Sequence, residues 1–330
     1  MAITKVTGAM LGNYVGGSAD DTVVVGDGAG DAITTGADNT FIGDNAGTAN
    51  TTGSESVAIG SEALEAQTTG GYNVGVGFQA LTANTTGDYN VAVGRTSLTA
   101  NTTGDSNIGI GFAALNATTT ADGNVAVGHG AGAANTTGTE NVFIGHEAGN
   151  DVTTGAGHVF VGWKAGDAVT TASQSTAIGD QALSAASTGS HNTAVGYNAM
   201  LANTTGDENT AVGSTALDAN TTGTQLTALG KGALSANTTA NANTALGHQS
   251  MILNTTGANN TAVGKEALKA NTTGAANTAV GATALDANTT ANYNVGVGYA
   301  ALTANTTGAD NTAVGSGALE ANTTASNNTG

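Results

Sequence analysis

The hydrophobic and polar positions of this chain repeat every 17 residues. The stretch NTAVGKEALKANTTGAA at residues 260–276 is followed directly by NTAVGATALDANTTANY. Each copy opens with alternating polar and aliphatic residues and then a glycine, which we number position 5. These glycines recur every 17 residues from Gly26 to Gly315, so there are 18 copies without insertion or deletion. The alternation, rich in Val, Thr and Ala, predicts one short β-strand per copy, and the Gly and Asn positions predict turns.

The constant spacing predicts the fold. Seventeen residues are too few for a helical hairpin, and 18 copies without slippage indicate that each copy stacks on the previous one. We therefore predict an all-β chain, a parallel β-solenoid (β-roll) of 18 seventeen-residue coils at residues 22–327. Residues 1–21 break the repeat and are interpreted as an attachment or initiation segment. Residues 328–330 begin a truncated nineteenth repeat.

The side chains at each position predict which face of a coil is buried. After residue 21, every charged side chain lies at position 6, 7, 10, 11, 16 or 17, so these positions form the solvent-exposed rims. Position 3 is Ala or Gly in most copies and position 9 is Leu or Met. Where position 3 is larger, as at Phe41 and Phe143, position 9 is Gly47 or Gly149. Both positions are therefore expected to fill one interior volume; Gly132, which accompanies a small Ala126, is an exception.

Position 4 is Val, Ile or Leu in every copy and lies on the opposite side of the strand from position 3. Together with position 2 it predicts an apolar stripe on the outside of the coil, which a soluble monomer rarely tolerates. We predict a homo-oligomer that buries this stripe. The alternative is a monomer with a flattened coil, in which positions 2 and 4 face its own core. The predicted interface residues include Val195, Val212, Val263, Val280 and Val314.

Threonine and asparagine occupy fixed positions in the second half of the repeat. Position 14 is Thr in all copies, and position 13 is Thr in all but Ser187. We expect one of these columns to point inward and the other outward. Asn at positions 12 and 1 is expected to bond turn backbone groups and to stack as a ladder, and Gly at positions 5 and 15 is expected to supply tight bends.

Composition and charge exclude several classes of protein. The net charge of −18 disfavours nucleic acid and anionic membranes as partners. The absence of cysteine excludes a disulfide framework, and no apolar run is long enough to cross a bilayer. The N-terminus lacks a secretory signal, so we expect synthesis in a cytosol. No copy concentrates catalytic groups, and we predict neither an enzyme nor a cofactor.

The repeats resemble those of a known family. NTAVGYNAM, NVAVGRTSL and NVFIGHEAG are similar to the β-roll repeats of trimeric autotransporter adhesin heads, and still more similar to the NTAVG…AL repeats of bacteriophage tail-fibre proteins. The opening AITKVTGAML resembles the start of phage fibre chains. The resemblance covers residues 22–330. It implies a homotrimer of parallel, left-handed β-rolls in a virion or extracellular fibre. The adhesin family also implies a signal peptide and a membrane anchor; the sequence shows neither, so we favour the phage fibre.

Two sets of rim residues are candidates for binding. His129 and His146 both occupy position 6 in consecutive copies, and such stacked histidines could hold a metal ion, although a solvated rim is the simpler interpretation. Aromatic residues at position 6 could stack on host glycans or could merely cover the coil edges. They are Phe78, Phe112, Trp163, Tyr197 and Tyr299.

The functional hypothesis is a structural shaft of a phage tail that supports host attachment. Its expected partners are copies of itself, a tail or baseplate component bound through residues 1–21, and a host surface glycan or protein. Two alternatives stay open. One is a bacterial cell-surface trimeric adhesin, which differs mainly in its anchor. The other is an ice-binding β-solenoid, because Thr columns can order water, although adjacent Thr residues do not have the spacing expected for it.

Overall fold

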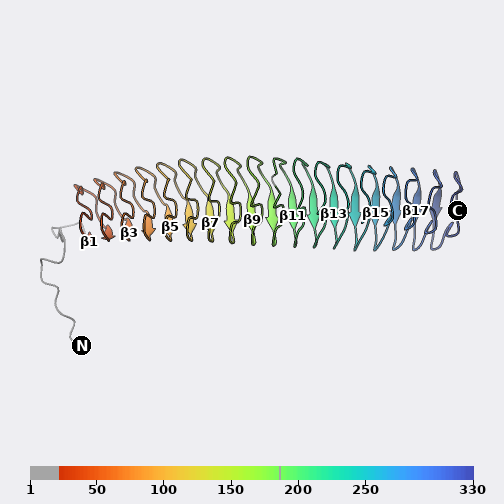
Figure 1. The fold of residues 1–330 in the computed structure, drawn as a ribbon, viewed down its shortest axis with the longest axis horizontal. Coiled ribbons are helices and arrows are strands. Elements are labelled where there is room, and N and C mark those ends of the chain that lie inside the picture. Colours follow the sequence, from red (N-terminus) through yellow and green to blue (C-terminus); the bar gives the residue numbers. More distant parts are fainter. Residues whose placement is uncertain (1–21, 186) are drawn as a thin grey trace, which may run out of the picture. The chain divides into compact units, whose positions relative to one another are not determined.

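Each 17-residue copy contributes one three-residue strand in the computed structural model, which describes residues 22–185 and 187–330. The chain divides into two compact units, with the boundary in the sequence between His158 and Val159. In each unit the coils stack side by side, with their strands in a row (Figure 1). The first unit holds β1 Val23–Val25, β2 Thr40–Ile42, β3 Val57–Ile59, β4 Val74–Val76, β5 Val91–Val93, β6 Ile108–Ile110, β7 Val125–Val127 and β8 Val142–Ile144. The second holds β9 Val159–Val161, β10 Thr176–Ile178, β11 Thr193–Val195, β12 Thr210–Val212, β13 Thr227–Leu229, β14 Thr244–Leu246, β15 Thr261–Val263, β16 Thr278–Val280, β17 Val295–Val297 and β18 Thr312–Val314.

Neighbouring strands within each unit pair in parallel, and each residue lies opposite the residue 17 positions away. In the first unit Val57 is opposite Val74, and in the second Thr193 is opposite Thr210. This register places equivalent side chains of successive coils in columns one strand spacing apart. The prediction of an all-β, parallel β-solenoid with seventeen-residue coils is confirmed. After β18, Thr329 bridges Thr312, so the last residues start another coil.

The strands orient their side chains as the sequence pattern predicts. The middle residue of every strand, position 3, is buried, whereas the flanking residues at positions 2 and 4 are half-buried or exposed. Ala at position 8 and Leu or Met at position 9 complete the apolar interior, as in Ala63 and Leu64. The flattened coil with positions 2 and 4 facing its own core is therefore wrong for this chain.

Large residues at position 3 fill space that glycine leaves open at position 9. A Cβ atom placed on Gly47 would lie 2.7–2.8 Å from three ring carbons of Phe41. The exception Gly132 has the same cause, because its Cβ would lie 2.5 Å from Phe143 of the following coil. One phenylalanine thus covers position 9 of its own coil and of the coil before it, and both positions must be small.

The thin apolar interior is completed by buried asparagine columns at positions 1 and 12. Asn90 Nδ2 and Asn101 Nδ2 both donate to the carbonyl oxygen of Gly104, at 2.8 and 3.0 Å. Asn90 Oδ1 in turn accepts the backbone N–H of Asn107 in the next coil at 2.9 Å. Similar bonds recur in both units, so each Asn joins two coils and satisfies buried backbone groups.

The bends depend on close backbone approach and on left-handed residues. Gly60 at position 5 has φ 135°, and a Cβ there would lie 2.5 Å from the carbonyl oxygen of Gly77. Gly53 at position 15 has no positive φ; its Cβ would lie 2.1 Å from the carbonyl oxygen of Gly70, so close packing between coils is the reason for glycine. The tight turning occurs at positions 7, 9 and 17, where Glu62 and Leu64 have φ 59° and 52°.

The expectation of one inward and one outward threonine column is wrong. Thr51 at position 13 is half-buried, Thr52 at position 14 is exposed, and neither belongs to a strand. Thr51 Oγ1 donates to the carbonyl oxygen of Thr68 in the next coil at 2.9 Å. The alternation of faces that holds in strands does not apply to this bend, and Asn at position 12 takes the interior place.

The predicted attachment segment, residues 1–21, lies outside the described residues. In the described part of the chain there is no helix long and apolar enough to cross a membrane.

Candidate functional site

Two surface features are candidates for function: the outer strand face and the rim at position 6. The outer strand face consists of the position-2 and position-4 side chains of each unit. Ile144 is 40% exposed and Leu229 is 42% exposed, although both are aliphatic. Of the predicted interface residues, Val195, Val212, Val263 and Val280 are half-buried in the single chain and Val314 is exposed. Each unit therefore presents a row of aliphatic side chains outside its coils.

The position-6 rim carries a continuous column of flat side chains in the first unit. Arg95 lies over Phe78 and Phe112, with its guanidinium carbon 5.9 and 5.6 Å from the two ring centroids. Phe112 and His129 have centroids 5.1 Å apart, and the rings of His129 and His146 are stacked at 4.9 Å with 6° between their planes. These distances are close to the strand spacing, so the 17-residue register itself aligns the side chains.

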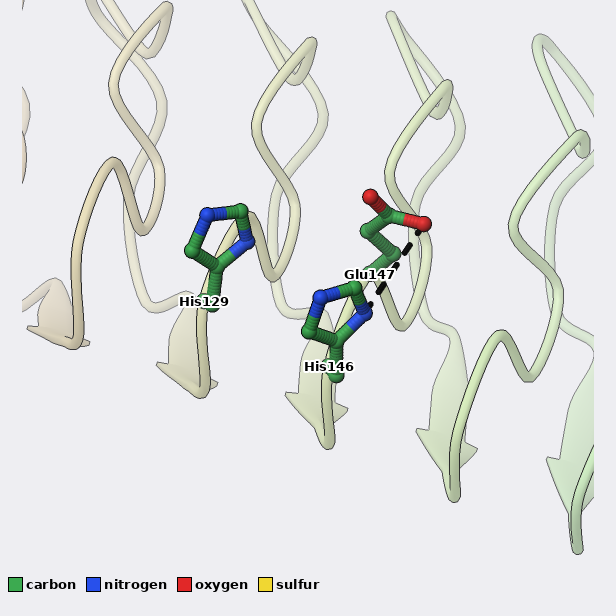
Figure 2. A group of neighbouring side chains, drawn as sticks. All are labelled: His129, His146 and Glu147. Atoms are coloured by element: carbon green, nitrogen blue, oxygen red, sulfur yellow. Dashed lines mark ion pairs between the residues drawn. The ribbon is translucent and has the colours of Figure 1, made fainter.

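The column ends in a group of metal-ligating side chains, shown in Figure 2. His129, His146 and Glu147 each offer one donor atom, and these atoms lie within 4.8 Å of one another. His146 Nδ1 is 3.8 Å from Glu147 Oε2. The structure thus brings together the two histidines that the sequence singled out. It adds Glu147, which sequence reasoning missed; an acidic position 7 beside a position-6 histidine is the signal that could have identified it.

The predicted rim aromatics do not form one surface. Phe78 and Phe112 flank Arg95 in the column, and both are exposed. In the second unit Trp163 contacts Lys164, whose Nζ is 5.3 Å from the indole ring. Tyr197 and Tyr299 are 53% and 65% exposed but lie several coils apart. A ligand that binds Tyr197 or Tyr299 would therefore contact one aromatic ring rather than a row of stacked rings.

A tyrosine pair at position 17 lies on another rim. The rings of Tyr72 and Tyr89 stack at 4.9 Å with 10° between their planes, and both are exposed. The negative charge of Glu55 is the largest of several influences that raise the pKa of Tyr72. Tyr72 therefore remains a neutral hydrogen-bond donor at physiological pH.

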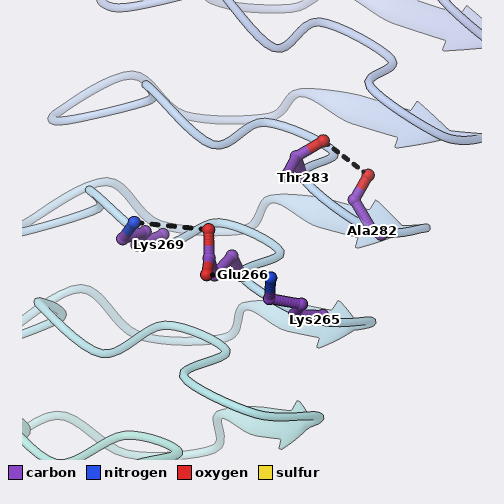
Figure 3. A network of polar contacts seen from close by, with 5 residues as sticks. All are labelled: Lys265, Glu266, Lys269, Ala282 and Thr283. Atoms are coloured by element: carbon purple, nitrogen blue, oxygen red, sulfur yellow. Dashed lines mark hydrogen bonds and ion pairs between the residues drawn. The ribbon is translucent and has the colours of Figure 1, made fainter.

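Charged rim residues of the second unit form a small network, shown in Figure 3. Lys269 Nζ donates to Glu266 Oε2 at 3.3 Å, and Lys265 Nζ lies 3.5 Å from Glu266 Oε1. The hydrogen bond from Lys269 is the main cause that lowers the pKa of Glu266. In the next coil Thr283 Oγ1 donates to the Ala282 carbonyl oxygen at 2.8 Å. Exposed pairs of this kind contribute little stability and resemble a solvated edge rather than a catalytic site.

Neither a protein-family model nor a curated protein matches this chain.

Proposed function

We propose that this protein is a structural fibre, a shaft of a phage tail that supports attachment to a host. Copies of the chain pack through their outer strand faces, and the resemblance to phage fibre and adhesin repeats favours a trimer of left-handed β-rolls. The role is mechanical. Stacked coils provide stiffness, and association of the chains hides the aliphatic stripe from water.

The outer strand face is the observation that carries the proposal. Position 4 is Val, Ile or Leu in all 18 copies, yet the side chain is half-buried or exposed in each one. By contrast, position 6 contains acidic, basic, aromatic and small residues. A column that stays aliphatic at position 4 while the neighbouring rim varies is best explained by a constant partner, and a second copy of the same repeat supplies a matching column at every coil.

The strand geometry favours side-by-side association of chains. Position-4 side chains of paired strands follow one another at one strand spacing, so a second chain with the same repeat can meet each of them in the same register. The varied rims remain outside such an interface and are available for contact with a host surface. In this proposal a tail component binds residues 1–21.

The experiment that tests the proposal is a mass measurement in solution by multi-angle light scattering or sedimentation equilibrium. The wild-type chain is expected at three times its monomer mass of 31.5 kDa. Val195→Asp places a charge on the outer strand face and should reduce the oligomer. Gln249→Glu adds the same charge at position 7, where Glu62 and Glu266 already occur, and should leave it intact.

Circular dichroism of both variants separates loss of assembly from loss of folding. Val195 lies on the outside of its own coil, so the strand signal of the variant should remain. A monomeric wild-type chain with normal strand content would refute the proposal. Equal oligomer mass for the two variants would show that the outer strand face is not the interface.

A further inference from the structure

From the geometry of the position-6 rim we infer a binding site for a divalent first-row transition metal, with Zn²⁺ as the reference ion. Its ligands are one nitrogen each from His129 and His146 and a carboxylate oxygen from Glu147. This inference does not depend on the proposed fibre, because all three ligands belong to one chain and one unit.

The distances fit a site that forms by side-chain rotation. With metal–ligand bonds of about 2.0–2.1 Å, donor atoms in a tetrahedral site lie about 3.3 Å apart. The three donors already lie within 4.8 Å of one another, and the His146–Glu147 pair is at 3.8 Å. Both imidazoles are exposed, so their tips can close the remaining gap without movement of the coil backbone.

The donor chemistry selects the type of ion. Two imidazole nitrogens and one carboxylate suit Zn²⁺, Cu²⁺, Ni²⁺ or Co²⁺, whereas Ca²⁺ requires six to eight oxygen ligands and Mg²⁺ keeps most of its water. Three protein ligands leave at least one coordination position for water. The net charge of −18 attracts cations of every kind, so selectivity among ions is the useful criterion.

The stacked rings give the site a specific signature. A metal ion binds in the plane of an imidazole, along the nitrogen lone pair. With only 6° between their planes and 4.9 Å between their centroids, the two rings cannot both direct a lone pair at one ion while stacked. Binding must therefore tilt at least one ring, and the environments of His129 and His146 must change together.

The backbone explains why the third ligand lies beside the histidines. Glu147 has φ 56°, one of the left-handed residues that occur at position 7 in most copies. This turn directs the Glu147 carboxylate back toward the position-6 rim, where Figure 2 shows it beside His146. His248 offers a comparison, because the next position 6 on either side of it is Lys231 or Lys265 rather than a second histidine.

The test uses the full chain, freed of metal by a chelator, and titrates it with Zn²⁺ in the presence of excess Mg²⁺ and Ca²⁺. The wild type should bind one Zn²⁺ per chain by calorimetry, and nitrogen–proton NMR spectra of the imidazoles should shift for His129 and His146 but not for His248. His129→Ala and His146→Ala should each weaken binding by at least about tenfold. Glu147→Gln should weaken it less but measurably, and His248→Ala should bind as the wild type does.

Three results would overturn the inference. They are Zn²⁺ uptake that survives the His129→Ala/His146→Ala double variant, equal loss in His248→Ala, and full competition by Ca²⁺ or Mg²⁺. Since the ring side chains are exposed, the alanine variants should keep the wild-type circular dichroism spectrum, so loss of binding is separable from loss of folding. The measurement does not depend on oligomer mass, so failure of the metal site and failure of the proposed fibre are distinguishable.

Discussion

The interior volume shared by Phe41 and Gly47 gives a prediction whose size follows from the structure. Phe41 is fully buried, and a Cβ on Gly47 would lie 2.7 Å from its ring. Phe41→Ala should therefore leave a cavity and destabilise the chain by about 3–5 kcal/mol. Gly47→Leu should overpack the same space and cost about 1–3 kcal/mol. If the two changes acted independently, the double variant would lose about 4–8 kcal/mol.

We expect the double variant Phe41→Ala/Gly47→Leu to be more stable than Phe41→Ala alone. It has Ala at position 3 and Leu at position 9, as does the following coil with Ala58 and Leu64. The left-handed backbone is no obstacle, because Leu64 already has φ 52°, close to the 61° of Gly47. A favourable coupling energy of at least about 2–3 kcal/mol should result. The double variant should remain less stable than the wild type, because Phe41 also covers Gly30 and its removal leaves that space empty.

The assay is guanidinium chloride unfolding of the four chains, followed by circular dichroism at one chain concentration. A fixed concentration is needed because association makes stability depend on it. Unfolding midpoints are compared at a common slope, since repeat arrays can depart from two-state behaviour. Phe41→Ala combined with Gly132→Leu is the control cycle, because Gly132 packs against Phe143 in a different coil. That pair should be additive within about 0.5 kcal/mol. Equal additivity for Phe41 and Gly47 would refute the shared volume.

Four further substitutions test other parts of the coil. Gly196 has φ 134°, and a Cβ there would lie 2.7 Å from the backbone carbonyl of Gly213, so Gly196→Ala should destabilise its coil severely. Gly232→Ala at position 7 should destabilise the chain only mildly, because the nearest atom to its Cβ lies at 3.6 Å. Asn254→Ala should cost about 1–3 kcal/mol in chemical unfolding, because the buried Asn237 Oδ1 loses the donor Asn254 Nδ2 and Asn271 Nδ2 loses the acceptor Asn254 Oδ1. Burial, the largest influence, raises the pKa of Asp286 above its ordinary 3.8, so its carboxylate opposes folding at neutral pH. Asp286→Asn should therefore melt higher than the wild type at pH 7, and the difference should shrink as the pH falls toward 3.8.

Controls for these variants come from exposed positions of neighbouring coils. Thr256→Ala lies two residues from Asn254 on the exposed side and should change stability by no more than about 0.5 kcal/mol. Asp310→Asn removes an exposed charge and should not reproduce the pH-dependent gain of Asp286→Asn. Equal losses of stability in Asn254→Ala and Thr256→Ala would contradict a stabilising role for the asparagine column at position 12. A pH-independent gain for Asp286→Asn would contradict burial as its cause.

The parts of the fold that follow a simple period could be predicted from the sequence. Strand position, parallel register and the inward direction of position 3 all follow from a 17-residue spacing combined with the two-residue alternation of a strand. The contact between Phe41 and Gly47 could also be predicted from the sequence, because both residues lie in one copy of the repeat. The exception at Gly132 was not, because its large neighbour Phe143 lies in the following copy.

The left-handed turns at positions 7, 9 and 17 could not be predicted, because most of the residues found there do not favour a positive φ. Leu64 has φ 52°, which costs an ordinary side chain energy that only the surrounding structure can offset. No residue preference would place leucine there, and the same holds for Glu147 at φ 56°. The histidine pair follows from the register alone. For Glu147 the sequence shows only that an acidic residue follows His146; the direction of its carboxylate depends on a backbone conformation that the residue itself does not favour.

The same geometry explains how one repeat can combine a constant assembly surface with local chemistry. Interior side chains of a coil contact mainly the coils before and after it, and the columns at positions 3 and 9 contain few residue types. The position-6 side chains lie on the rim, where they contact their column neighbours and adjacent position-7 side chains such as Glu147 and Lys164. Replacing Arg95 by a histidine would therefore change the rim without repacking any interior column. Because the rim does not pack into the core, each coil can carry a different aromatic, cationic or metal-binding side chain at position 6. In five adjacent coils these side chains contact one another in a column: Phe78, Arg95, Phe112, His129 and His146.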